Sequence, residues 1–246
     1  MVADLERTFA VPLTIGVVSD THVYERGRRQ IPVEVLEVFE RAGVGLIVHA
    51  GDLNVRTVLS ALAASAPVLA VHGNNDTPDL LDQLPAVIRF QAGRFEFVLV
   101  HGHQGRTARA VARTFAGSAD LVIYGHSHIP KIERVADTIL FNPGSPTDRR
   151  WGPHFGIGLI RVTAEHCAPE LLLFADPRHL TAIDIEPNPY TAQGSRQDDP
   201  VATSSTETRS DPRDASELPA AGSDAIAAGG ACRHAAGDDP ASGPGV

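Results

Sequence analysis

Five short motifs rich in aspartate, asparagine and histidine lie within the first 128 residues, and each directly follows an apolar, largely β-branched run. Runs of this kind are typical of buried strands, so each motif is expected where a strand ends. Side chains this far apart in sequence can act together only if a sheet brings the strand ends to one place. The motifs are Asp20-Thr21-His22, Gly51-Asp52, Gly73-Asn74-Asn75-Asp76, His101-Gly102-His103 and Gly125-His126-Ser127-His128.

Helical patterns separate the early strands, and further strands dominate the later part of the chain. Alternation of strand and helix favours parallel strands, whereas the late hairpins favour antiparallel ones. The predicted fold class is therefore α/β (α+β), with two packed mixed sheets flanked by helices. Strands are expected at 13–19, 45–49, 67–72, 86–91, 94–100, 120–124, 131–135, 138–141, 155–162 and 170–175, and helices at 32–42, 54–65 and 105–116.

The composition changes sharply near residue 187. From there to residue 246 large apolar side chains are scarce, and small or polar residues supply most of the sequence. Such a segment cannot bury enough apolar surface to offset its conformational entropy, so residues 187–246 are expected to form a disordered acidic tail. Residues 1–186 would then be one folded domain, and it carries only −4 of the net charge of −9.

Composition and charge disfavour several classes of protein. No apolar run approaches the ~20 residues that cross a bilayer, so no membrane association is expected. The N-terminus has acidic residues where a signal peptide has positive charge, which favours a cytoplasmic location. A net charge of −9 disfavours a nucleic-acid polymer as partner. Cys167 and Cys232 lie outside the motifs, so neither a disulfide nor thiolate chemistry is expected.

The side chains of the motifs form a mixed set of oxygen and nitrogen donors. Such a set suits Mn²⁺, Fe, Zn²⁺ or Ni²⁺, because Cu(I) and Fe–S clusters prefer thiolates. Seven ligands are too many for one catalytic zinc, which takes three and keeps an open position. They fit two divalent metals roughly 3.5–4 Å apart that share a carboxylate and a water or hydroxide. The predicted ligands are Asp20, His22, Asp52, Asn74, His101, His126 and His128.

The order D-x-H, G-D, G-N-x-D, H-G-H, G-H-x-H resembles that of the calcineurin-like metallophosphoesterase superfamily. The H-G-H motif and the sequence NPGSP at 142–146 make the chain similar to its small single-domain phosphodiesterase branch. The resemblance spans about residues 13–175, so the expected domain at 1–186 would be a metallophosphoesterase domain. It implies a four-layer αββα sandwich with two metals, manganese first among them, between the sheets' loop ends. It implies one metal on Asp20, His22, Asp52 and His128, and another on Asp52 as the bridge, Asn74, His101 and His126.

Asn75 departs from the commonest pattern of that family. Many members have a histidine at this position, where it is a candidate proton donor to the leaving group. An amide cannot act as a general acid, so the substrate should have a leaving group that needs little help. This departure favours phosphodiesters over stable phosphomonoesters.

Several residues beside the motifs have weaker assignments. His49 and His72 precede glycine motifs and are expected at the floor of the site, where they would hydrogen-bond to ligands rather than bind metal. His103 is a candidate phosphate contact, with a structural role as the alternative. Asp76 is expected to orient a histidine or cap a turn, since Asp76-Thr77-Pro78 is a helix-start signal.

The loop after 142 has two features, each with two interpretations. Asn142 and Ser145 could line the site, although NPGSP is by itself a turn signal. Arg149 and Arg150 could attract an anionic substrate, but a solvated pair of charges is the preferred interpretation.

The predicted function is a metal-dependent phosphodiesterase that acts by in-line attack of a hydroxide bridging two metals, with Asp52, Asn74 and His103 as catalytic residues. The alternatives are a phosphomonoesterase for a small metabolite and a non-catalytic metal-binding scaffold of the same fold. The expected partner is a small phosphodiester, and a homo-oligomer remains open.

Overall fold

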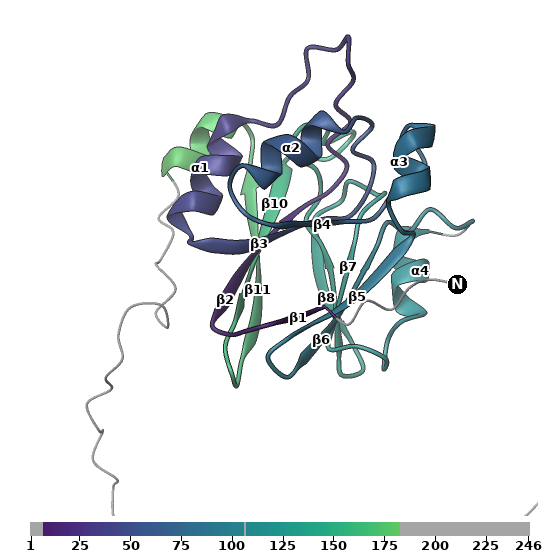
Figure 1. Cartoon of the computed structure of the whole chain (residues 1–246), viewed down its shortest axis with the longest axis vertical. Coiled ribbons are helices and arrows are strands. Elements are labelled where there is room, and N and C mark those ends of the chain that lie inside the picture. The colour runs from purple at the N-terminus through teal and green to yellow at the C-terminus, as the bar shows by residue number, and fades with distance from the viewer. Residues whose placement is uncertain (1–6, 106, 183–246) are drawn as a thin grey trace, which may run out of the picture. The chain divides into compact units, whose positions relative to one another are not determined.

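Two mixed β-sheets pack face to face in the computed structural model, and helices cover their outer faces (Figure 1). The structure describes residues 7–105 and 107–182. The predicted tail at 187–246 lies outside the described residues, so its separation from a 1–186 domain stays a prediction. No helix of the described part is long and apolar enough to span a bilayer.

The five-stranded sheet has the order β11-β10-β2-β3-β4. Strands β2, β3 and β4 are parallel, and β10 joins β2 in antiparallel orientation before turning back into β11. Its members are β2 (Leu13–Val18), β3 (Val44–His49), β4 (Val68–Ala70), β10 (Phe155–Val162) and β11 (Cys167–Phe174).

The six-stranded sheet has the order β1-β5-β6-β7-β9-β8. Strand β6 leaves a hairpin with β5 and then runs parallel to β7, which is parallel to β9. The carboxyl ends of β6 and β7 therefore lie at one edge. The strands are β1 (Thr8–Phe9), β5 (Val87–Ala92), β6 (Phe95–Val100), β7 (Leu121–Tyr124), β8 (Lys131–Val135) and β9 (Thr138–Asn142).

Apolar side chains alternate along the strands between two layers of core. In β3, Ile47 packs toward the helices α1 and α2, whereas Leu46 and Val48 pack between the sheets. Val98 in β6 faces α4 on the opposite outer side. The sandwich therefore has four layers, since helix, sheet, sheet and helix are separated by three apolar clusters. The helices are α1 (Val33–Arg41), α2 (Thr57–Ala63), α3 (Pro78–Gln83), α4 (Ala108–Arg113) and the 3₁₀ turn η1 (Pro177–Ala182).

The predicted fold class and four-layer arrangement are confirmed, and the differences concern element ends and three short elements. Helix α2 begins at Thr57 rather than residue 54, because Asn54 has a left-handed φ of 75° and its N–H donates to Asp76. The short elements β1, α3 and η1 were not predicted as elements, although Pro78 does occupy the first position of α3.

Candidate metal centre

The ends of four strands, two from each sheet, converge on one cluster of carboxylates and imidazoles. Asp20 follows β2 and Asp52 follows β3, while His101 follows β6 and the Gly125–His128 motif follows β7. Two groups form there, each with its ligand atoms within 4.8 Å of one another. They are Asp20, His22 and His128, and Asp52, His101 and His126.

The first group is compact and almost wholly buried. The Nε2 atoms of His22 and His128 lie 3.1 Å apart, and His128 Nε2 lies 3.3 Å from Asp20 Oδ1. His22 Nε2 is 4.0 Å from the same oxygen. Three donor atoms thus surround one small volume, as the ligands of a metal ion do.

Asp52 lies between the two groups. Its Oδ2 is 3.3 Å from His101 Nε2 in its own group and 3.6 Å from His22 Nε2 in the other. One carboxylate oxygen therefore faces nitrogen donors of both groups. A carboxylate in this place can bridge two cations.

Hydrogen bonds at the opposite ring nitrogen fix the tautomer of three histidines. Nδ1 faces Asn54 Oδ1 at 3.1 Å in His22, the Ala50 carbonyl at 2.7 Å in His101 and the Asp148 carbonyl at 2.5 Å in His128. Oxygens of this kind only accept, so Nδ1 carries the hydrogen and Nε2 of the neutral ring presents a lone pair. Each Nε2 is therefore set to bind a cation.

Two observations show that cations fit this donor set. The lone pairs on His22 and His128 repel at 3.1 Å unless a proton or a cation lies between them. Among the described residues, His101 Nε2 and His126 Nδ1 are buried without a hydrogen-bond partner. Buried polar atoms normally have partners, and a cation could serve as the partner of both nitrogens.

The two carboxylates are held in place as anions. Burial opposes the ionisation of Asp52, but His101 and the N–H groups of Asn75 outweigh it and keep the pKa of Asp52 below its usual range. The backbone N–H of Asn75 donates to Oδ1 at 2.8 Å and its side-chain amide donates to Oδ2 at 2.7 Å. Burial likewise opposes ionisation of Asp20, and His128, His101 and Ser19 lower its pKa.

Burial opposes protonation of His101, but the Asp52 and Asp20 carboxylates outweigh burial and raise the pKa of His101. The same carboxylates that would attract a cation therefore also attract a proton. Metal and proton compete for this site, as they do at most metal sites that use imidazole.

Asp76 ties together the two loops that carry Asp52 and Asn75. It accepts backbone N–H groups from Gly73 at 2.7 Å, Asn54 at 2.6 Å and Asp52 at 3.2 Å. It is therefore neither a member of the two groups nor the cap of α3, whose N-cap is Thr77.

The backbone at the strand ends is left-handed rather than extended. Each strand turns sharply as it ends, so His126 and His128 enter different groups. Positive φ values occur at Asp20 (53°), His22 (43°), Asp52 (57°), His126 (66°) and His128 (57°). Such conformations cost energy and are concentrated at functional sites.

Two glycines allow the strand ends to approach the carboxylates. A Cβ at Gly73 would lie 2.1 Å from Asp52 Oδ1, and one at Gly125 would lie 2.8 Å from Asp20 Oδ2 and 2.0 Å from Ser19 Oγ. No side chain can occupy these positions without displacing the acid.

The remaining predicted residues lie around the two groups. Asn74 is exposed on the Gly73–Asp76 turn, and within the described part of the chain its side chain makes no hydrogen bond. His103 is half-buried, with its ring 5.4 Å from that of His101 and its Nδ1 buried without a protein partner in the described residues. Burial and the neighbouring charges of His101 and His72 lower the pKa of His103, so it is neutral near pH 7.

His49 is fully buried, and its hydrogen bonds go to Thr21 and the Gly51 backbone rather than to the side chain of a predicted ligand. The N–H of Gly51 donates to its Nδ1 at 3.2 Å, so Nε2 carries the hydrogen and faces Thr21 Oγ1 at 3.1 Å. Burial lowers the pKa of His49 to about 3. His72 lies further out, half-buried, with its ring 5.9 Å from that of His103.

Sequence reasoning missed Asn54 and Asp148, which orient His22 and His128 through the oxygens described above. An asparagine two residues after Asp52 was a readable signal for the first. Asp148 acts through its main-chain carbonyl, which any residue possesses, so no signal existed for it. Asn142 and Ser145 fasten loops: Asn142 Nδ2 donates to the Gly125 carbonyl at 3.0 Å and Ser145 Oγ to the Asp20 carbonyl at 2.7 Å.

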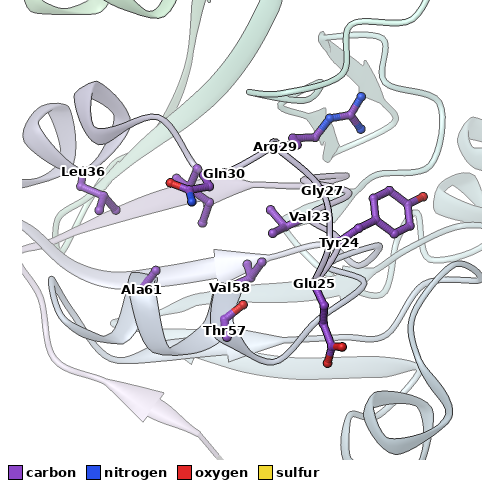
Figure 2. Close-up of a pocket in the computed structure, with 11 residues that line it drawn as sticks. Val23, Tyr24, Glu25, Gly27, Arg29, Gln30, Leu36, Thr57, Val58 and Ala61 are labelled. Carbon is purple, nitrogen blue, oxygen red and sulfur yellow. The ribbon is translucent and has the colours of Figure 1, made fainter.

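A cavity of about 460 Å³ lies beside the centre rather than at it (Figure 2). The loop at 23–31, which follows His22, forms one wall, and Leu36 of α1 and Val58 of α2 contribute to the other. No predicted ligand lines it. One lining residue, Arg29, forms an ion pair of 3.2 Å with Asp148 and so joins this loop to the loop that orients His128.

Comparison with known proteins agrees with the geometry. Residues 13–165 match the model of the calcineurin-like phosphoesterase superfamily domain. A probable metallophosphoesterase of Methanothermobacter thermautotrophicus is 34% identical, over 67% of this chain and 95% of its own length. A phosphodiesterase of Methanocaldococcus jannaschii is 28% identical, over 54% of this chain and 83% of its own.

Solved structures show the same fold. Vps29 of Chaetomium thermophilum superposes with a TM-score of 0.56 at 18% identity, over 66% of this chain and 98% of that one. An archaeal phosphodiesterase superposes with a TM-score of 0.53 at 24% identity, over 66% of this chain and all of that one, 100%. At these identities the likeness concerns the fold alone.

Proposed function

Because the chain belongs to the calcineurin-like phosphoesterase superfamily, we propose that it is a phosphodiesterase that works with two divalent cations. One observation carries the proposal: Asp52 Oδ2 lies between two buried groups of donors, 3.3 Å and 3.6 Å from an imidazole nitrogen of each. This arrangement suits two neighbouring cations that share one carboxylate.

Seven side chains would hold the cations. Asp20, His22 and His128 would take one, with Asp52 as the shared ligand. His101 and His126 would take the other with Asp52 and Asn74. Asn74 is exposed, so its amide would turn inward from the Gly73–Asp76 turn to complete the second set.

The chemistry divides between the cations and the chain. Two bound divalent cations would lower the pKa of a water molecule between them and neutralise charge on the phosphate oxygens. Asn54, Ala50 and Asp148 keep three imidazoles in the tautomer that binds metal. Mn²⁺ fits a donor set of oxygens and imidazoles, as do Ni²⁺, Fe and Zn²⁺.

The substrate preference rests on Asn75. Its side-chain amide donates to Asp52 Oδ2, and an amide N–H is too weak an acid to protonate a leaving group. His103, with a buried Nδ1 that has no protein partner in the described residues, would contact the phosphate as a hydrogen-bond donor. A phosphodiester with a good leaving group fits such a site better than a stable phosphomonoester.

The test is hydrolysis of bis-p-nitrophenyl phosphate by metal-stripped protein to which Mn²⁺, Ni²⁺, Fe²⁺ or Zn²⁺ is returned. We expect metal-dependent turnover, and Asp52→Asn should reduce kcat/KM by at least about a hundredfold. Turnover of p-nitrophenyl phosphate in preference to the diester would identify a phosphomonoesterase. Full metal content without turnover of either ester would identify a metal-binding scaffold of this fold, and the proposal would be abandoned.

A further inference from the structure

The loop between β9 and β10 is built directly onto the metal centre. Thr147 Oγ1 donates to the Thr21 carbonyl at 2.6 Å, and the Asp148 carbonyl accepts His128 Nδ1 at 2.5 Å. Ser145 Oγ accepts the N–H of Asp148 at 2.8 Å. The base of this loop is therefore fixed beside Asp20 and His128, and Arg150 lies only two residues beyond the carbonyl that accepts the His128 hydrogen bond.

A tight turn forms the tip of the loop. The N–H of Gly152 donates to the Arg149 carbonyl at 2.8 Å, which places Arg150 and Trp151 at the two central positions. Arg150 has a left-handed φ of 47°, a conformation that a residue with a side chain adopts at a cost. Arg149 turns back, with Nη1 2.7 Å from the Pro153 carbonyl and its guanidinium 5.4 Å from the Phe155 ring.

Within the described part of the chain, the two central side chains make no hydrogen bond, ion pair or ring contact. Trp151 is 100% exposed, and it is the single tryptophan of the chain. Within residues 7–105 and 107–182 the Arg150 guanidinium forms no ion pair or hydrogen bond. Burial is the main cause of the lowered pKa of His126, and the charges of His101 and Arg150 lower it further against the opposing Asp20 and Asp52.

We propose that Arg150 and Trp151 form a subsite that recognises a planar aromatic group attached to the phosphate, with Trp151 stacking on the ring and Arg150 pairing with the anion. The proposal rests on the proposed function, since it names the class of diester: an aryl or nucleobase-bearing phosphodiester.

Physical chemistry assigns these roles to the two residues. An indole offers a large, rigid face, and stacking on an aromatic ring tolerates any ring with a π-face. A guanidinium forms paired hydrogen bonds with phosphate oxygens. An aliphatic diester would use Arg150 alone, so the two side chains together discriminate for the ring.

Binding tests the subsite without any need for turnover. Metal-loaded protein is titrated with phenylphosphonate and, as its matched control, methylphosphonate; adenosine 5′-monophosphate and ribose 5-phosphate form a second pair. We expect the two aromatic probes to quench Trp151 fluorescence and the two aliphatic ones to leave it unchanged. A response to phenylphosphonate alone identifies an aryl site, and a stronger response to the nucleotide identifies a nucleobase site.

Calorimetry on variants separates the two side chains. Trp151→Ala should raise the Kd of the aromatic probes by about fivefold or more, because one ring-stacking contact is lost. The Kd of the aliphatic probes should stay unchanged. Trp151→Phe should restore most of that loss, whereas Arg150→Ala should weaken all four probes alike. Val33→Ala and Arg113→Ala, exposed residues outside the site, serve as controls for lost apolar surface and lost charge.

Kinetics then distinguish this inference from the proposed function. In Trp151→Ala, KM for bis-p-nitrophenyl phosphate should rise while kcat and metal content stay within about twofold, because the stack is made before and during the reaction alike. The subsite is overturned if the wild type binds aromatic and aliphatic probes equally and Trp151→Ala binds them with the same affinities. This conclusion holds whether or not the protein hydrolyses the ester. Selective aromatic binding without turnover supports the subsite and overturns only the phosphodiesterase.

Discussion

Hydrogen bonds at Nδ1 determine the tautomer and the orientation of three histidines at the centre. In His22, His101 and His128, Nδ1 is hydrogen-bonded to an oxygen, and this leaves the lone pair of Nε2 free to bind a metal. Fixing a ring in one tautomer and one orientation removes a cost that metal binding would otherwise incur. A metal site here depends on these supporting oxygens as well as on its ligands.

Replacing Asn75 by histidine tests the link between this position and the leaving group. Asn75→His removes the amide that contacts Asp52 Oδ2 and supplies a group that can donate a proton. General-acid catalysis contributes about 10²–10⁴-fold where the leaving group is poor. We expect the ratio of kcat/KM for an alkyl phosphomonoester to that for bis-p-nitrophenyl phosphate to rise by at least about tenfold.

Asn75→Ala is the matched control for that substitution, since it removes the same amide and adds no acid. It should lower turnover of both esters without changing their ratio. A ratio that rises equally in both variants would show that loss of the amide, rather than proton donation, controls the preference.

His49 predicts a pH dependence of folding stability. Burial holds its pKa near 3, against about 6.5 in the unfolded chain. Below pH ~6.5 the imidazole of His49 is protonated in the unfolded chain but stays neutral in the folded protein. The free energy of unfolding therefore falls as the pH drops toward 3, by up to about 1.4 kcal/mol per pH unit. His49→Gln should flatten this slope in metal-free protein, measured by urea denaturation at a series of pH values.

The exposed His154→Gln variant serves as the comparison for His49→Gln and should keep the wild-type slope. Identical slopes in all three proteins would show that His49 is protonated as readily folded as unfolded.

The donor chemistry of the candidate ligands could be predicted from the sequence, because it is set by the type of side chain. Six of the seven predicted ligands lie in the two groups, while Asn74 is exposed outside them, and metal binding itself stays a prediction. The tautomers could not be predicted from the sequence. They depend on carbonyl oxygens such as those of Ala50 and Asp148, which every residue carries, and on tertiary contacts that place them.

Each strand that feeds the centre ends in a left-handed turn rather than continuing into an extended loop. Strand positions could be predicted from apolar, largely β-branched runs, and most boundaries agree within a residue or two. Loop geometry could not, because Asp and His rarely adopt positive φ, and here the surrounding contacts impose it. The start of α2 was misplaced for the same reason, at Asn54.

Gly73→Ala tests whether the turn after β4 must lie directly against the Asp52 carboxylate. Its Cβ would lie 2.1 Å from Asp52 Oδ1, so the carboxylate or the whole turn must move. We expect loss of bound metal by elemental analysis, a fall in kcat of at least about a hundredfold, and about 1–3 kcal/mol of destabilisation from overpacking.

Gly43→Ala is the control for Gly73→Ala, since a Cβ there meets nothing within 4 Å and only its φ of 63° is strained. It should lose about 1 kcal/mol of stability and keep its metal. Wild-type metal content in Gly73→Ala would contradict the geometry.

At the scale of the molecule, both groups of ligands join the two sheets. In the first group, Asp20 and His22 come from the five-stranded sheet and His128 from the six-stranded one. In the second group, Asp52 comes from the five-stranded sheet and His101 and His126 from the six-stranded one. A bound cation would therefore cross-link the sheets. Two packed sheets flanked by helices could be predicted from the order of strand and helix patterns along the sequence. The four-layer arrangement and the division of the ligands into two sets were expected only from the resemblance to a known family.

Metal removal should therefore lower thermal stability. A cation present at about 100 times its Kd adds about 2.7 kcal/mol, so chelation should lower Tm by several degrees, and restored Mn²⁺ or Zn²⁺ should raise it again. His128→Ala should reduce the shift. An unchanged Tm in calorimetry with and without chelator would show that the groups do not bind these metals tightly.

The expected tail can be tested by deletion. A chain ending at residue 186 should keep the metal content, Tm and kcat/KM of the full chain, because all the proposed ligands lie within residues 20–128. A fall in any of these would place residues 187–246 in the folded unit.

The interleaving of ligands between the sheets also sets an order of events during biosynthesis. A nascent chain that has exposed only residues 13–72 offers Asp20, His22 and Asp52, and neither group is complete until His126 and His128 have emerged. The second sheet must then form and dock before the donors meet. On the proposed function, metal binding would thus be a late step of maturation, and a newly made chain that held both cations would already have docked its two sheets.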